Sequence, residues 1–181
     1  AVEAHYGVTL SDIPERAVLV NERNRGLSKL YDELPGISFS AYLDMLHKLL
    51  QTPLREQIVA DNLPAKPGAG KRVYLVGSLL SSSAAAAAIE KAGLVVAGDR
   101  LTESKRLFSA PLVPAGGDVF VNIANSILGN KVSPTQSNFD AILREDMEEI
   151  RAKQLRGVLF VTQKFCEPYD YLFTAYQRML E

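Results

Sequence analysis

The segment GVLFVTQKFCEP, residues 157–168, decides both the fold and the candidate site of this chain. Val158 to Thr162 are mostly β-branched and aromatic, which predicts a buried strand. The turn that follows carries the only cysteine of the chain, Cys166, and Pro168 suits the first turn of a last helix. Because open α/β sheets bind ligands beyond the carboxyl ends of their strands, Cys166 is a candidate functional residue.

A strand–helix–strand pattern lies upstream of this segment. Val73 to Val76 and Leu94 to Ala97 are short apolar runs that predict strands, and a glycine ends each of them. The helix expected between them begins at serines 81–83, and Gly93 is its C′ residue. Further helices are expected at 118–128, 137–153 and 169–180. The chain from residue 71 is therefore predicted to form a small α/β domain, Rossmann/flavodoxin-like, with three layers and a short parallel sheet.

The first third of the chain has a helical pattern. One helix with Pro14 in its first turn ends near Pro35, and a second begins at Ser38 or Ser40 and stops before Pro53. A short third helix is expected at 54–60. We predict a helical segment at 1–62, a Pro/Gly-rich linker at 63–70 and an α/β domain at 71–181. Because the chain lacks an initiator Met and three strands make a thin sheet, we expect truncation at both ends.

The composition disfavours several classes of protein. The 20 basic and 21 acidic residues nearly cancel, which gives no electrostatic support for nucleic-acid or anionic-membrane binding. No apolar run approaches the roughly 20 residues that cross a bilayer. A single cysteine cannot form an internal disulfide, which favours a reducing, cytoplasmic location.

Other candidate motifs are weak. The segment GSLLS that starts at Gly77, with Asp99 downstream, resembles part of a dinucleotide fingerprint but lacks its second and third glycines. His5 and His47 lie far apart without further ligands, so neither a metal site nor a catalytic triad is expected. The acidic run at 145–149 has the spacing of a solvated helix face with i,i+4 ion pairs. A nucleotide-dependent oxidoreductase is therefore disfavoured.

Cys166 has two interpretations from the residues alone. A single cysteine flanked by apolar residues is more often a small buried hydrophobe than a ligand. Its position after a strand, with Gln163 and Lys164 nearby, favours a functional role. One cysteine cannot hold an iron–sulfur cluster by itself.

The segment resembles the GVIF…QKFCDP motif of the catalytic subunits of 2-hydroxyacyl-CoA dehydratases and benzoyl-CoA reductases. Residues 72–78 resemble the family's middle-domain strand, and residues 89–106 resemble its IEEAGA-VV…D…R run. The leading helix, with Asn21 and Arg25, is similar to the family's YN-x-x-R helix. The resemblance spans essentially the whole chain, and QKFC-x-P is its most specific part.

The resemblance implies an oxygen-sensitive enzyme of two related subunits. Three cysteines of a subunit hold a [4Fe–4S] cluster, and Cys166 would be the last of these ligands. An ATP-hydrolysing activator delivers an electron that makes a ketyl radical of an acyl-CoA, from which the 2-hydroxyl leaves. The turns at Ser78 and at Gln163 and Lys164 would line the acyl-CoA cleft. No catalytic residue is assigned, and the chain alone is expected to hold no cluster and to be inactive.

Two alternatives stay open at this point. A benzoyl-CoA reductase-type subunit would pass the electron into an aromatic ring, and the motif does not separate this branch from the dehydratases. A non-catalytic α/β binding module would keep the fold without the chemistry. The sequence also leaves the acyl group open.

Overall fold

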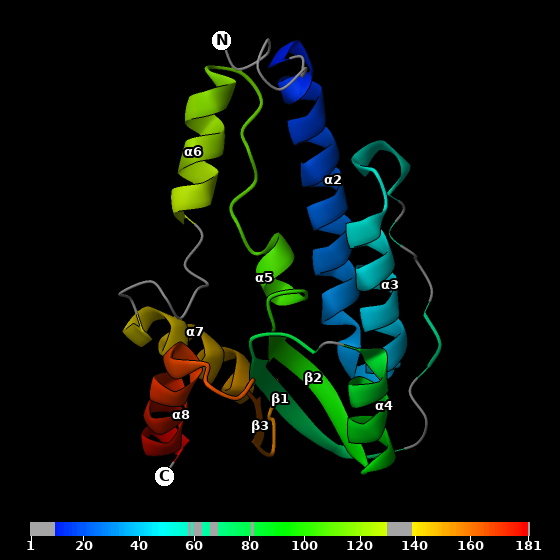
Figure 1. Ribbon diagram of the computed structural model, residues 1–181, viewed down its shortest axis with the longest axis vertical. Coiled ribbons are helices and arrows are strands. Elements are labelled where there is room, and N and C mark those ends of the chain that lie inside the picture. The colour runs from blue at the N-terminus through cyan, green and yellow to red at the C-terminus, as the bar shows by residue number, and fades with distance from the viewer. Residues whose placement is uncertain are drawn as a thin grey trace.

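A computed structural model describes residues 10–57, 59, 63–65, 69–80, 82–129 and 139–180 of the chain. Its sheet is parallel and open, with the strand order β2-β1-β3 (Figure 1). This confirms the predicted α/β class. The strands are β1 (Lys71–Gly77), β2 (Leu94–Arg100) and β3 (Val158–Val161).

Helices lie on both sides of the sheet, and α6 lies beside the N-terminal half of α2, away from the strands (Figure 1). The third predicted helix is a 3₁₀ turn at 54–56, and residues 58 and 60 lie outside the described part of the chain. The helices are α2 (Ile13–Asp32), α3 (Phe39–Gln51), α4 (Ser83–Lys91), α5 (Lys105–Phe108), α6 (Val119–Gly129), α7 (Phe139–Ala152) and α8 (Glu167–Leu180), with 3₁₀ turns at Leu10–Asp12, Leu34–Gly36 and Leu54–Glu56.

Side chains of β1 alternate between two cores. Val73 and Leu75 pack with residues of α2, α3 and α4, which we call the first core. Tyr74 and Val76 point to the opposite face and pack with α7 and α8, which we call the second core. Because successive side chains of a strand face opposite ways, one central strand supports both layers. The sheet is therefore covered on both faces, as parallel sheets usually are.

Several predicted helix ends are confirmed by their capping contacts. The Ser38 hydroxyl accepts the N–H of Ala41 (3.3 Å) at the start of α3. Asp118 accepts the N–H groups of two residues at the start of α6, at 2.8 and 3.2 Å. Gly93 follows α4 with φ +77°, the left-handed conformation that glycine adopts without a steric penalty. Four other features, His5, Ser81, Ser137 and linker residues 66–68, lie outside the described residues.

Two strand predictions need correction. The second strand does not end at Ala97 but continues to Arg100. Gly98 lets the strand continue close beside β1, because a Cβ there would lie 2.9 Å from the Tyr74 ring. The polar residues that follow it find buried partners. The third strand is half-buried rather than buried, because β3 lies at an edge and pairs with β1 alone among the described strands.

The acidic run of α7 is the largest correction, because only part of it is a solvated face. Glu148 is exposed, and the expected i,i+4 pairing is confirmed for Glu149 with Lys153. Asp146 is fully buried and pairs with the guanidinium of Arg100, which is 1% exposed. Glu149 pairs with Lys105 (2.6 Å) and Lys153 (2.8 Å). Partners far away in sequence bury these carboxylates, which helical periodicity cannot indicate. The buried charge network comprises Arg100, Lys105, Glu145, Asp146, Glu149 and Lys153 with the hydroxyls of Tyr31, Tyr74 and Tyr176.

None of the helices within the described ranges has the length and apolar character needed to cross a bilayer.

Candidate functional site

The carboxyl ends of the three strands meet at one edge of the sheet, which we call the carboxyl edge. The chain leaves β1 toward α4, which packs in the first core, and leaves β3 toward α8, which packs in the second core (Figure 1). Loops that turn to opposite faces open a crevice between neighbouring strands, and open α/β sheets bind ligands at this switch point. The pairing of Gly77 with Val161 places Ser78 next to Thr162. The structure thus brings the two predicted turns together.

Ser78 has a free hydroxyl at this crevice. Gly77 allows the close approach, because a Cβ there would collide with the carbonyl oxygen of Val161. The Ser78 carbonyl accepts the N–H of Thr102 (2.9 Å), which joins the loops after β1 and β2. The Ser78 Oγ is buried and has no hydrogen-bond partner among the described residues. A buried hydroxyl without a partner is unfavourable, so this oxygen is available to a ligand.

The turn after β3 is exposed and strained. Gln163 and Lys164 are exposed, and the Lys164 Nζ lies 4.9 Å from the ring centroid of Phe165. Phe165 has φ +68° and is 85% exposed. A bulky residue in the left-handed region costs free energy, and such conformations gather at functional sites. The strain adjoins Cys166 directly.

Cys166 is half-buried at the base of this turn. Its N–H donates to the carbonyl of Gln163 (3.2 Å), and its own carbonyl accepts the N–H groups of Tyr169 (3.0 Å) and Asp170 (3.3 Å). The side chain packs against the rim of the second core. Cys166 therefore lies at the carboxyl edge as a partly buried residue.

Two residues at this edge, Glu103 and Arg106, have site-like features that the sequence did not indicate. Glu103 is 8% exposed; its Oε1 accepts the N–H of Leu80 (2.5 Å), while its Oε2 has no partner among the described residues. Burial raises the pKa of Glu103 above its usual value. Arg106 donates from Nη1 to Thr102 (3.0 Å) and to the Tyr169 hydroxyl (2.8 Å). The signal that could have found them is their position directly after the second strand.

A cavity of about 520 Å³ opens at the same edge, between the end of α3 and the loops after β1 and β2. Its walls are mainly leucines with a few polar groups, the composition typical of small-molecule sites. Gln163, Lys164 and Cys166 do not line it, but Arg106 links its Thr102 to Tyr169 of α8. We call it the edge pocket; it is lined by His47, Leu50, Gln51, Leu79, Leu80, Thr102, Glu103 and Leu107.

Comparison with known families decides the affiliation. A family model described as 2-hydroxyglutaryl-CoA dehydratase, D-component, matches residues 17–181. The chain belongs to this dehydratase family. The match begins within α2 and runs to the end of the chain, and it confirms the resemblance seen in the QKFC segment. The description names one component, so the dehydratase system of this family has more than one. No curated protein matches the chain significantly.

The dehydratase-family chain does not contain a complete metal site within its described residues. No group of three His, Cys, Asp or Glu side chains in that part of the chain could hold a metal ion. A [4Fe–4S] cluster needs several thiolates, and the chain has one cysteine. The residues present therefore do not fit a whole cluster, and Cys166 could supply one ligand to it.

The dinucleotide interpretation is not supported in this dehydratase-family chain. Asp99 is fully buried, and its carboxylate accepts the N–H of Leu101 (2.9 Å) and the hydroxyl of Ser104 (2.6 Å). Burial raises its pKa to about 7. A side chain held in this way does not face a ribose.

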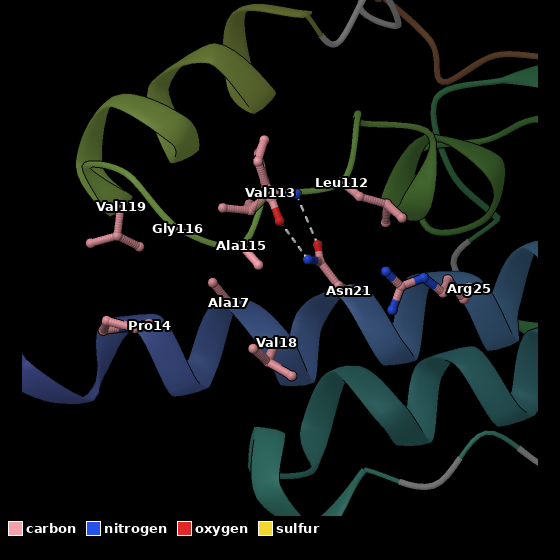
Figure 2. A pocket seen from close by; sticks show the side chains of 11 residues that line it. Pro14, Ala17, Val18, Asn21, Arg25, Leu112, Val113, Ala115, Gly116 and Val119 are labelled. Carbon is pink, nitrogen blue, oxygen red and sulfur yellow. Dashed lines mark hydrogen bonds between the residues drawn. The ribbon is translucent and has the colours of Figure 1, made fainter.

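A second cavity, of about 440 Å³, lies between the first half of α2 and the loop at 111–117 (Figure 2). Asn21 is its central polar residue, and its amide exchanges two hydrogen bonds with the backbone of Val113, at 2.7 and 3.0 Å (Figure 2). These bonds tie the loop to the helix and leave the amide little capacity for a ligand. The carboxyl edge is therefore the better candidate site of this family member.

Proposed function

We propose that the chain forms part of the catalytic subunit of an iron–sulfur 2-hydroxyacyl-CoA dehydratase, which removes water from a 2-hydroxyacyl-CoA. The family match supports a dehydratase component. The single observation that carries the finer proposal is the meeting of Ser78 with the turn at 163–166 at the switch point of the sheet. We place the enzyme in the cytoplasm, as a heterodimer with a sister subunit that an ATP-dependent activator reduces.

In this proposal the residues of the carboxyl edge hold the thioester. The unpartnered hydroxyl of Ser78 donates to an oxygen of the substrate. Lys164 is exposed and attracts the phosphates of the coenzyme, and the Gln163 amide offers both a donor and an acceptor. Cys166 would contribute one thiolate to a [4Fe–4S] cluster, and the other thiolates would come from outside this chain, which has a single cysteine. A bound cluster would supply one-electron reduction of the substrate.

The test is iron binding by the full-length subunit that carries this chain, reconstituted under anaerobic conditions. We expect Cys166→Ala to lose most of the bound iron, because a cluster held by three protein thiolates loses one of them. Thr162→Ala changes an exposed side chain four residues away and serves as the matched control, which should keep its iron. Unchanged iron content in Cys166→Ala would show that the ligand assignment is wrong.

Activity distinguishes the alternatives. The reconstituted enzyme with its activator should dehydrate a 2-hydroxyacyl-CoA and should not reduce benzoyl-CoA. Ring reduction would favour the reductase-type subunit. A cluster-free protein that binds acyl-CoA without turnover would favour a non-catalytic module.

A further inference from the structure

Three of the six buried side-chain atoms that lack a hydrogen-bond partner in the described part of the chain lie at the carboxyl edge. The Oγ of Ser78, the Oε2 of Glu103 and the Nε of Arg106 are all buried without a hydrogen-bond partner in the described part of the chain. Each such atom costs free energy unless a ligand or water satisfies it. Glu103 is the one of the three that lines the edge pocket, where its Oε2 is an unused acceptor.

The edge pocket has few ionisable side chains in its wall. Among the described residues that line it, Glu103 is the only acidic one and His47 the only basic one, while four leucines form most of the remaining wall. The nearby guanidinium of Arg106 is already engaged with Thr102 and Tyr169. A ligand carboxylate entering this pocket would lose its hydration among the leucines and would meet the Glu103 carboxylate, whose charge His47 and Arg106 attenuate.

We propose that the edge pocket receives the side chain of the acyl group and selects 2-hydroxyacyl-CoA substrates whose side chain is uncharged, branched alkyl or aryl, over dicarboxylic ones. The inference rests on the proposed function. The volume of about 520 Å³ lies within the range of pockets that enclose small ligands. Glu103 Oε2 accepts a hydrogen bond from a donor of the thioester, and the leucines contact the alkyl or aryl group.

Equilibrium binding to the anaerobic full-length subunit tests this selectivity. The probes are 2-hydroxy-4-methylpentanoyl-CoA, 2-hydroxyglutaryl-CoA and free CoA. We expect the alkyl thioester to bind at least about tenfold more tightly than the dicarboxylic one, the ratio that about 1.4 kcal/mol of desolvation and repulsion produces. A tighter fit of the dicarboxylic thioester, or equal affinity, would overturn the inference.

Two variants test how the charge in the pocket affects the affinity ratio, and a third serves as the control. Leu50→Arg places a cation at the pocket rim and should bring the affinity ratio to one or invert it. Val18→Arg is the matched control, because Val18 and Leu50 are equally exposed (50% and 51%) and Val18 lines the other cavity. The control should keep the wild-type ratio. Glu103→Gln should reduce the ratio to about threefold or less, since it removes the repelling charge.

The outcomes separate the inference from the function on which it rests. The same ratio in Leu50→Arg and Val18→Arg would overturn the pocket assignment while thioester binding itself persists. No binding of either thioester or of CoA would overturn the proposed function and the inference together. A thermal melt of each variant identifies any that fails to fold, and Leu50 is exposed enough that its substitution keeps the core intact.

Discussion

The buried charge network and the carboxyl edge are both rich in polar side chains, but they differ in how completely those side chains are paired. In the network the carboxylates are paired: Asp146 receives the Arg100 guanidinium and the hydroxyls of Tyr74 and Tyr176, and Glu149 receives two lysines. The Nη1 and Nη2 of Arg100 have no hydrogen-bond partner among the described residues, although Nη2 is ion-paired with Asp146. At the edge, Ser78, Glu103 and Arg106 each keep a buried atom without a partner. Paired groups hold elements together, whereas unpaired groups mark a place where a ligand completes the bonding.

The direction of each pKa shift also depends on how strongly the group is paired. Burial lowers the pKa of Arg100, but the Asp146 carboxylate outweighs this and raises the pKa overall. Burial raises the pKa of Glu149, but Lys105 and Lys153 outweigh it and leave the pKa below the usual value. At Glu103 burial is the largest effect; two backbone N–H groups and the nearby His47 and Arg106 lower the pKa but do not outweigh burial, so the pKa is raised. Pairing therefore decides the sign of each shift.

The largest expected effect comes from breaking the network. Asp146→Ala leaves Arg100 buried without its main counter-charge, and removal of one partner of a buried pair costs about 3–5 kcal/mol. Denaturant unfolding measures the free energy of unfolding. Glu148→Ala, an exposed carboxylate on the same helix, is the control and should change stability by no more than about 0.5 kcal/mol. Equal losses in the two variants would show that the network contributes nothing specific.

Asp99, which adjoins the network, predicts a pH dependence of stability. Its pKa is raised from 3.8 to about 7, so the folded state keeps the proton over a range where the unfolded state releases it. The free energy of unfolding should therefore fall as pH rises from about 4 to about 7, by up to about 4 kcal/mol in total. Glu145 and Glu149 have lowered pKa values, so the stability that they contribute is present above their usual value of 4.5 and is lost only as the pH falls below it.

Unfolding curves across this pH range check the prediction. Asp99→Asn cannot titrate and should have a flatter profile between pH 4 and about 7. A wild-type profile as flat as that of the variant would contradict a raised pKa at Asp99.

The smallest effect on stability is expected at the carboxyl edge. Ser78→Ala removes an unpartnered hydroxyl and should leave the free energy of unfolding unchanged or raise it by up to about 1 kcal/mol. Ser104→Ala removes a hydroxyl that donates to Asp99 (2.6 Å) and should lower it by about 1–3 kcal/mol. The affinity for the thioester should fall in Ser78→Ala and should not change in Ser104→Ala. Equal destabilisation by both substitutions would remove the contrast between the two regions.

Local signals predicted much of the fold. Ser38, Asp118 and Gly93 act on backbone groups within a few residues, so their capping roles follow from the sequence. The strand β1 is apolar on both faces and was predicted within two residues at each end. The QKFC turn was placed at the carboxyl edge because a strand pattern precedes it.

Long-range partners explain what was missed. Asp146 has the spacing of a surface residue, and only Arg100, 46 residues away, shows why it is buried. The second strand was expected to end at Gly98 because glycine followed by aspartate is a turn signal, yet the strand continues because Asp99 and Arg100 find buried partners in other elements. The edge pocket forms where α3 meets the loops after β1 and β2, and no local pattern connects His47 with Glu103. The sequence therefore predicts the part of the site that one loop forms, the QKFC turn. It does not predict the edge pocket, which three elements form together.

Tyr31 joins the two layers that the sheet separates. Its hydroxyl accepts the N–H of Asp99 (2.6 Å) and lies 3.0 Å from Glu149 Oε1, so a residue of α2 completes bonds of both β2 and α7. Unfolding of the leading helices would leave Asp99 and Glu149 without this hydrogen-bond partner in an interior that excludes water. Opening of one layer thus lowers the cost of opening the other, and the described part of the molecule is expected to unfold cooperatively, in one step.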